Sequence, residues 1–341
     1  LVSGLKAAEK KQVVAQIAAG ELDLVVGTHA LFQSGVEFKS LALVVVDEQH
    51  RFGVHQRLAL MQKGASEQSR PHQLIMTATP IPRTLSMMAY GDLDCSVIDE
   101  LPPGRQPITT RVISQNQRLT LMDKLVSHCK AGHQAYWVCT LIEESEALQA
   151  QAAEVTAQQL QQALPNLSIG LVHGRCPSAE KERLMNGFLT RQYDVLVATT
   201  VIEVGVDVPN ASLMVIENPE RLGLAQLHQL RGRVGRGSVA SYCLLLYGNA
   251  LTTSAKKRLD IMRSSQDGFY IAEQDLEMRG PGEVLGVKQS GLMSFKMADL
   301  LRDQAVLEDV VQWSTRAPLT LQQQEALLYR WLKSAERFAA V

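Results

Sequence analysis

The chain has 341 residues, 46% hydrophobic and 20% charged, which allows about two domains of roughly 150 residues and excludes wholesale disorder. Its 34 Lys and Arg against 35 Asp and Glu give a net charge of −1, so any binding site for a polyanion has to be local. No apolar run approaches the roughly 20 residues that cross a bilayer, and five cysteines without paired spacing predict reduced, mostly buried thiols rather than disulfides or a zinc site.

Short aliphatic runs alternate with helical stretches along most of the chain. The runs are residues 23–26, 41–46, 73–76, 135–140, 169–172, 195–198, 213–216 and 243–246. Runs of this length are typical of parallel strands that are buried on both faces between helices. Amphipathic helices are predicted at 119–129, 149–164 and 177–188, the last with Ser178 as its N-cap. The predicted fold class is therefore α/β.

The stretch LPPGRQP at 101–107 holds three prolines and a glycine, which neither a helix nor a central strand accommodates. We therefore predict a linker at 100–108 between one α/β domain at 1–99 and another at 109–248. The remaining tail, 249–341, is helix-rich, with a glycine-dense interruption and a possible capping box, Thr320 with Gln323. Because the sequence begins without a methionine, we expect it to be a piece of a longer protein.

Acidic and hydroxyl side chains follow the predicted strands of the first domain. Residues 44–46 lead directly into the tetrad DEQH at 47–50, and TATP at 77–80 follows the next run. Open α/β sheets bind ligands at the carboxyl ends of their strands, and phosphoryl transfer uses one acid for Mg²⁺ and another group to orient the nucleophile. A solvated turn or a turn cap is the plain alternative, also for GTH at 27–29.

The second domain carries the strongest single signal, QLRGRVGRG at 229–237, where arginines alternate with glycines. Arginine binds phosphate oxygens bidentately, and glycines let a backbone approach closely; a generic basic patch is the alternative. Thr199, Thr200 and GVDVP at 205–209 follow another strand, with a β-turn as the alternative. No Gly-Lys dipeptide occurs, so these residues lack the phosphate-cradling loop G-x-x-x-x-G-K-[ST].

In chain order, DEQH, TATPIPRT, VHGR, TTVIEVGVDVP and QLRGRVGRG match five motifs of superfamily 2 helicases. Within that group, DEQHRFGVHQR and YWVCTLIEESE resemble the RecG family of ATP-dependent branched-DNA helicases, over nearly the whole chain. The tail stretch DGFYIAEQDLEMRGPGEVLGVKQSG resembles the translocation motif shared with the Mfd family. The resemblance implies two RecA-like parallel-sheet lobes, the first incomplete, and a helical C-terminal translocation-motif region.

The resemblance also implies ATP and Mg²⁺ as cofactors and a role for each matching residue. Asp47 would bind the magnesium of ATP, and Glu48 would polarise the attacking water. Contact with the γ-phosphate is implied for Gln229, Arg233 and Arg236, and contact with the DNA backbone for Thr28, His173, Thr199 and Thr200. Coupling of the nucleotide site to the rest of the motor is implied for Gln49, His50, Thr77, Thr79, Gly205 and Asp207. A role in translocation is implied for Arg258 and Gln289. The plain alternatives for the last two are a solvated helix face and an ordinary loop amide.

The resemblance also implies that the protein holds DNA through its backbone and has a single-stranded-DNA-binding protein as a partner. It further implies a monomer in the bacterial cytoplasm, associated with the nucleoid. Because these residues lack the family's wedge domain and phosphate loop, we expect them not to hydrolyse ATP by themselves. Three alternatives stay open: a duplex translocase of the Mfd type, a catalytically silent DNA-binding or interaction fragment, and an RNA helicase.

Overall fold

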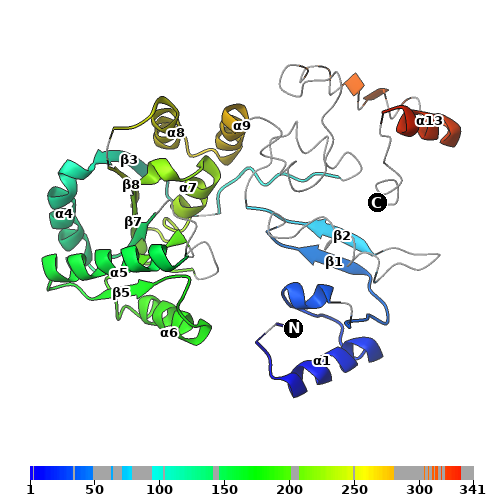
Figure 1. Cartoon of the computed structure of the whole chain (residues 1–341), viewed down its shortest axis with the longest axis horizontal. Helices are drawn as coiled ribbons and strands as arrows, with labels where there is room; N and C mark the ends of the chain where they lie inside the picture. The colour runs from blue at the N-terminus through cyan, green and yellow to red at the C-terminus, as the bar shows by residue number, and fades with distance from the viewer. Residues whose placement is uncertain are drawn as a thin grey trace. The chain divides into compact units, whose positions relative to one another are not determined.

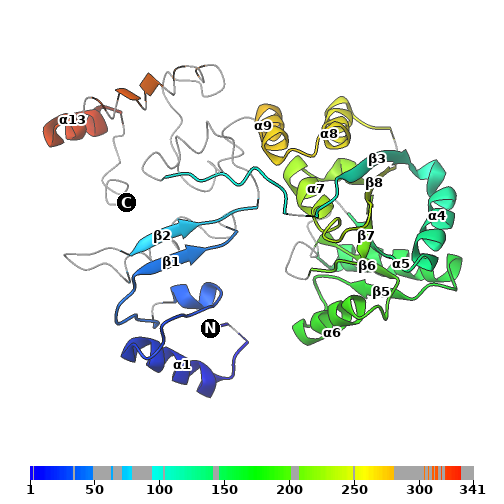
Figure 2. The same ribbon diagram turned by 180° about the vertical axis from the view of Figure 1, so that it is seen from behind.

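The computed structural model divides into two compact units, residues 1–78 with 281–341, and residues 79–280. Figure 1 and Figure 2 show the elements of each unit from opposite sides. The residues that the structure describes are 1–2, 4–33, 35–48, 63, 71–78, 94–102, 104–140, 146–200, 207–248, 250–279, 303, 306, 309, 310, 312, 313, 316 and 319–331. Within these ranges, no helix has the length and apolar character that a bilayer span requires.

The first unit contains a two-stranded parallel sheet with helices before it and a C-terminal helix. Its elements are α1 (Ala7–Ala19), the 3₁₀ helix η1 (His29–Phe32), β1 (Leu43–Val46), β2 (His72–Ile75) and α13 (Leu321–Trp331). At the start of α13, the Thr320 N–H donates to Gln323 Oε1 at 2.9 Å, and the Gln323 N–H donates to Thr320 Oγ1 at 3.4 Å. The predicted capping box is therefore confirmed.

Strand β1 is buried on one face only. Val44 and Val46 are buried against Phe32 and neighbouring apolar residues, whereas Leu43 and Val45 are exposed. This alternation is the period-two pattern of a strand with one covered face. The expectation that all strands are buried on both faces is therefore wrong for this sheet, because the described residues cover one side of it.

The first predicted strand, residues 23–26, is also wrong. Leu24 and Val26 are 81% and 76% exposed. The Val26 carbonyl accepts a hydrogen bond from the amino group of Leu1, and the Thr28 N–H donates to the Leu1 carbonyl at 3.0 Å. A strand needs a ladder of such bonds along a neighbour, and among the described residues these two bonds both go to Leu1.

The second unit is built around a six-stranded sheet in the order β3-β8-β7-β4-β6-β5, with every pair parallel. Its strands are β3 (Ile108–Ser114), β4 (Gln134–Cys139), β5 (Ile169–Val172), β6 (Val195–Ala198), β7 (Ala211–Glu217) and β8 (Ser241–Tyr247). Its helices are η3 (Gln115–Gln117), α4 (Arg118–Lys130), α5 (Glu146–Ala163), α6 (Ser178–Leu189), η5 (Pro219–Arg221), α7 (Leu224–Arg231), α8 (Thr253–Ser264) and α9 (Gly268–Arg279). The α/β fold with parallel sheets is thereby confirmed.

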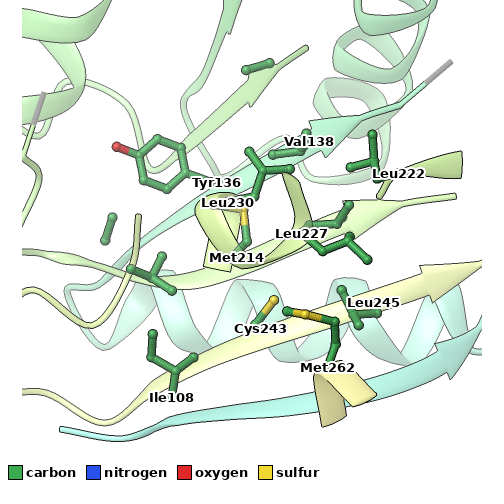
Figure 3. Close-up of a cluster of buried hydrophobic side chains, with 14 of the residues drawn as sticks. Ile108, Tyr136, Val138, Met214, Leu222, Leu227, Leu230, Cys243, Leu245 and Met262 are labelled. Carbon is green, nitrogen blue, oxygen red and sulfur yellow. The ribbon is translucent and has the colours of Figure 1, made fainter. Parts of the chain in front are cut away.

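Helices cover both faces of this sheet, which is why its central strands are fully buried. On one face, Trp137 of β4 packs with Leu125 of α4 and Leu160 of α5. On the other face, Tyr136 of the same strand lies in a cluster with Leu227 of α7 and with residues of α6 and α8 (Figure 3). Each large apolar side chain buried in this way contributes about 1.5–3 kcal/mol to folding.

The predicted helices at 119–129, 149–164 and 177–188 are confirmed as α4, α5 and α6. The predicted cap of α6 is wrong, because Ser178 is the first helical residue and Pro177 precedes it without a side-chain cap. The cysteines are free. Burial raises the pKa of the Cys129, Cys139 and Cys243 thiols to about 12, so these three are unreactive packing residues, as predicted.

Candidate active site

The acidic pair Asp47 and Glu48 follows β1 directly, at the carboxyl end of the strand. The Glu48 N–H donates to Asp47 Oδ1 at 2.8 Å, and the Glu48 backbone is left-handed, with φ of 52°. Such a conformation costs about 1–3 kcal/mol outside glycine and is found mainly at functional turns. The turn therefore presents Asp47 exposed and Glu48 partly buried at a position where α/β sheets bind ligands.

Strand β2 ends beside this pair. The Met76 N–H donates to the Val46 carbonyl at 2.8 Å, which extends the ladder to the last residue of β1. Thr77 follows and is exposed. The structure thus brings Asp47, Glu48 and Thr77 to the same edge of the small sheet, as the strand order in the sequence predicts.

Thr28 precedes a 3₁₀ helix instead of following a strand. Its carbonyl accepts the Leu31 N–H at 3.0 Å, at the start of η1. The residue is exposed. Its contact with DNA therefore stays a prediction that rests on accessibility alone.

The arginine segment, residues 229–237, starts on the last turn of α7 and continues through a glycine-rich turn. Gly235 has φ of 76°, and a Cβ there would lie 2.9 Å from Cγ1 of Ile108. A Cβ on Gly237 would lie 2.6 Å from the carbonyl oxygen of Pro209. In the structure, the glycines therefore allow a close approach to the unit's own chain, where the sequence suggested a close approach to phosphate.

Asp207, Arg233 and Arg236 come together around Tyr136. Arg236 Nη1 lies 3.6 Å from Asp207 Oδ1, in a partly exposed ion pair. Burial raises the pKa of Tyr136 to about 12, while the charges of Arg233 and Arg236 oppose that rise and Asp207 adds to it. The Tyr136 hydroxyl points away from the labelled apolar side chains in Figure 3. Two guanidinium groups and one carboxylate thus act on one buried phenol, while Gln229 is half-buried on α7.

His173 and Thr199 follow β5 and β6, which pair side by side. The Thr199 N–H donates to the Val172 carbonyl at 3.3 Å, so the two strand ends stay together. His173 Nε2 lies 3.6 Å from Glu154 Oε1 on α5. Thr199 is buried and Thr200 half-buried, so Thr200 is the more accessible of the two hydroxyls.

Arg258 on α8 is not part of a solvated helix face. Its Nη2 donates to the Glu220 carbonyl at 2.6 Å, whereas the neighbouring Lys256 and Lys257 are exposed. Arg258 therefore ties α8 to η5, the turn that follows β7. Five predicted site residues lie outside the described part of the chain, namely Gln49, His50, Thr79, Gly205 and Gln289.

Sequence reasoning missed a partly buried ion pair, with a buried glutamate, at the carboxyl ends of β4 and β7. Arg118, the first residue of α4, pairs with Glu217, the last residue of β7, and its guanidinium carbon lies 5.2 Å from the centre of the Trp137 ring. The Thr140 hydroxyl donates to the Glu217 carbonyl at 2.6 Å. These contacts hold the carboxyl ends of β4 and β7 together. A glutamate that ends an apolar run was the only signal in the sequence.

Among the described residues, no cluster of three or more His, Cys, Asp or Glu side chains is arranged to hold a metal ion. A magnesium ion that arrives with a nucleotide needs only one or two carboxylates, because phosphates and waters supply its other ligands. Asp47 is exposed at a strand end and meets that requirement. The acidic pair therefore fits a metal that is bound jointly with a phosphate.

Three family descriptions match the chain in order. Residues 1–88 match the DEAD/DEAH box helicase family, residues 117–238 the helicase conserved C-terminal domain, and residues 265–338 the C-terminal part of domain 3 of ATP-dependent DNA helicase RecG. With an acidic pair after a strand of one parallel sheet and an arginine segment beside another, these matches place the chain in the class of superfamily 2 helicases with RecA-like units.

Individual relatives narrow this class. The RecG helicase of Escherichia coli (strain K12) is 61% identical over 328 residues, which are 95% of this chain and 47% of the relative. The RecG helicase of Pasteurella multocida is 56% identical and covers 100% of this chain and 50% of its own. A solved structure of RecG bound to a three-way DNA junction is 44% identical, with a TM-score of 0.65, over 90% of this chain and 39% of the other.

The chain belongs to the RecG family. It spans about half the length of the curated relatives it matches. Because these relatives are RecG helicases, the comparisons lend no support to the alternative of an Mfd-type translocase.

Proposed function

We propose that this chain is the motor of an ATP-dependent DNA helicase that remodels branched DNA, such as stalled forks and Holliday junctions, in recombination and repair. One observation carries the proposal: the acidic pair and the arginine segment are both intact in a chain 61% identical to a RecG helicase over 95% of its length. The solved relative is bound to a three-way DNA junction, which supports branched DNA as the substrate.

In the proposed reaction, Asp47 holds the Mg²⁺ of ATP, and Glu48 orients and polarises the attacking water. This division of labour between two acids is what phosphoryl transfer requires. The strained turn at Glu48 supports it, because the left-handed backbone fixes the carboxylate relative to Asp47. Thr77, at the neighbouring strand end, is proposed to couple the acids to the rest of the unit.

Arg233 and Arg236, with Gln229, supply the positive charge and hydrogen bonds that meet the γ-phosphate. An arginine used in this way contributes about 10³–10⁵ in rate. In the structure Arg236 is paired with Asp207 at 3.6 Å. Such partly exposed pairs are worth roughly 0–1 kcal/mol, so Arg236 can exchange its carboxylate for a phosphate at little cost.

Thr28, His173, Thr199 and Thr200 are proposed to contact the DNA backbone. Contacts to phosphate carry no base sequence, so binding should be salt-sensitive and sequence-independent. We further propose a monomer in the bacterial cytoplasm, associated with the nucleoid, with a single-stranded-DNA-binding protein as partner. The 341 residues alone should not hydrolyse ATP, because they contain no G-x-x-x-x-G-K-[ST] loop.

The test compares the full-length protein with the 341-residue chain on a synthetic DNA fork, with duplex RNA as a second substrate. We expect the full-length protein to hydrolyse ATP and separate the DNA fork. Glu48→Gln should abolish both activities, while Glu9→Gln, on the exposed surface of α1, should change neither.

Two results would contradict the proposal separately. A full-length protein that neither hydrolyses ATP nor separates forks, or that prefers RNA, refutes the helicase function. Fork-stimulated ATP hydrolysis by the 341-residue chain that disappears with Glu48→Gln refutes the expected inactivity of the chain alone.

A further inference from the structure

We infer that Lys63 is a positioning residue for DNA contact: its ammonium group holds the loop around η1, which carries Thr28, in one conformation. The η1 loop consists of residues 28–33, 35 and 36. The effect on DNA rests on the proposed function, in which Thr28 contacts the DNA backbone. The contacts of Lys63 themselves lie entirely within the first unit.

Lys63 donates to three backbone carbonyls of the η1 loop. Its Nζ lies 3.3 Å from the carbonyl oxygen of Leu31 and 2.7 Å from that of Val36, and it also donates to the carbonyl of Gln33. An ammonium group has three donors and no acceptor, so the three carbonyls use all of its donors. Lys63 follows these residues by 27 to 32 positions. The loop is therefore fastened by a distant part of the sequence.

The η1 loop has an apolar side as well as this polar one. Ala30 and Val36 are 1% and 2% exposed and pack in an apolar cluster that includes α1. Within the loop, the Leu31 N–H donates to the Thr28 carbonyl at 3.0 Å, and the Val36 N–H donates to the Gln33 carbonyl at 3.1 Å. A single 3₁₀ turn has few bonds of its own. Contacts from outside the loop therefore decide its conformation, and Lys63 supplies the polar ones.

The surroundings of Lys63 favour this holding role over direct attraction of DNA. Burial is the largest influence and lowers the pKa of Lys63, while the charge of Glu37 raises it. The ammonium group thus lies among backbone atoms and near a carboxylate of the same unit, which weakens the field that it projects into solvent. We therefore expect the lysine to act through the loop.

Thr28 is connected to Lys63 through the loop backbone. Its N–H donates to the Leu1 carbonyl at 3.0 Å, and its own carbonyl accepts the Leu31 N–H. The carbonyl of Leu31 is in turn one of the three that Lys63 binds. Thr28 is exposed, so a loop with one conformation presents its hydroxyl at a fixed place. Binding of DNA then does not have to order the loop first, which strengthens it.

The test measures ATP hydrolysis by the full-length protein as the concentration of a synthetic DNA fork is raised. Lys63→Met should raise the fork concentration for half-maximal stimulation by ~10-fold. The rate at saturating fork should change by less than ~2-fold, because the acidic pair is untouched. Lys63→Arg keeps the charge but does not place three hydrogens on one nitrogen, so its half-maximal concentration should fall in between.

The matched control is Lys10→Gln. Lys10 has the same charge and contacts the same loop, but it donates to the Gln33 side chain, at Oε1, at 2.9 Å on the exposed surface. Its loss should leave the half-maximal fork concentration unchanged. The salt dependence separates holding the loop from contacting DNA. Loss of a phosphate contact lowers the slope of log affinity against log salt concentration by about 1, whereas Lys63→Met should leave this slope unchanged.

A second measurement reports the state of the loop without any activity. The amides of Leu31 and Val36 should exchange their hydrogens faster in Lys63→Met than in Lys10→Gln. The Met76 amide, which donates to a carbonyl of β1 outside the loop, should exchange equally in both and shows that the unit is folded.

The inference is wrong if exchange at Leu31 and Val36 stays unchanged in Lys63→Met. It is also wrong if Lys63→Arg recovers fully or the salt slope falls by about 1, because Lys63 would then contact phosphate directly. A saturating rate that falls as much as the affinity would make Lys63 a purely structural residue.

Thr28→Val tests the proposed contact with DNA separately. If this variant raises the half-maximal fork concentration and Lys63→Met does not, the inference fails while the proposed function stands. If Thr28→Val changes nothing, or if the wild type does not hydrolyse ATP, the proposed function fails instead. The exchange measurement then still decides whether Lys63 holds the loop.

Discussion

Replacing His228 by asparagine should remove a pH dependence of stability that this histidine imposes on the second unit. The imidazole accepts a hydrogen bond from Arg231, which requires the neutral ring. Burial, followed by the charges of Arg231 and Arg105, lowers its pKa from 6.5 to about 4. An asparagine Oδ1 can accept the same bond from nearly the same position as Nδ1, but it does not titrate.

The sign and size of the effect follow from this pKa. Because the unfolded chain binds a proton more tightly than the folded one, acid favours unfolding. The contribution of His228 is complete above pH 6.5 and is lost as the pH falls towards 4. Between pH 7.5 and pH 5, the unfolded state gains about 2 kcal/mol from protonation that the folded state does not share.

The assay is urea unfolding at pH 7.5 and pH 5, followed by the fluorescence of Trp137, which is fully buried in the second unit, in proteins whose Trp313 and Trp331 are replaced by Phe. The wild type should lose about 2 kcal/mol more over this range than His228→Asn. Other histidines contribute equally to both proteins and cancel. His72→Asn, at an exposed position of β2, should behave as the wild type. Equal losses in the wild type and His228→Asn would refute the reasoning.

Two further predictions concern the stability of the second unit, measured by the same unfolding assay. Arg118→Met leaves Glu217 buried without its cation and should cost about 3–5 kcal/mol, most of which should return when Glu217 is also changed to Met; no recovery would mean that the ion pair is not the cause. Gly235→Ala should cost about 1–3 kcal/mol more than Gly132→Ala, because both glycines have positive φ but only the first would meet Ile108; equal costs would exclude that contact.

The central strands of the second unit could be predicted because burial on both faces selects continuous apolar runs, as in β6 and β7. Strand β3 was missed because it lies at the sheet edge and its sequence, ITTRVIS, contains three consecutive polar residues, so that no continuous apolar run marks it. The run at 23–26 shows the opposite error. Its composition suits a strand, but strand formation depends on a pairing partner, which composition does not specify.

The candidate site likewise contains residues whose positions the sequence predicts and residues whose surroundings it does not. The positions of Asp47 and Glu48 follow from local order, because an acid after a strand lies at the sheet edge whatever the rest of the chain does. Arg231 and Arg233 look equivalent in the sequence, yet the first is buried by carbonyls about thirty residues further on. Tyr136 likewise gained its surroundings from side chains of α7 and the following turn, which no local pattern reveals.

The order of strands in the second unit has a consequence for its synthesis. β3 is the first strand of this sheet to leave the ribosome, but Ile108 pairs with Ser241, 133 positions later. At 5–20 residues per second, β3 would wait about 7–27 s for β8, its one neighbour in the described part of the sheet. During that time its unpaired backbone is open to other extended chains. We expect nascent chains of this length to be clients of ribosome-associated chaperones until β8 emerges and closes the edge.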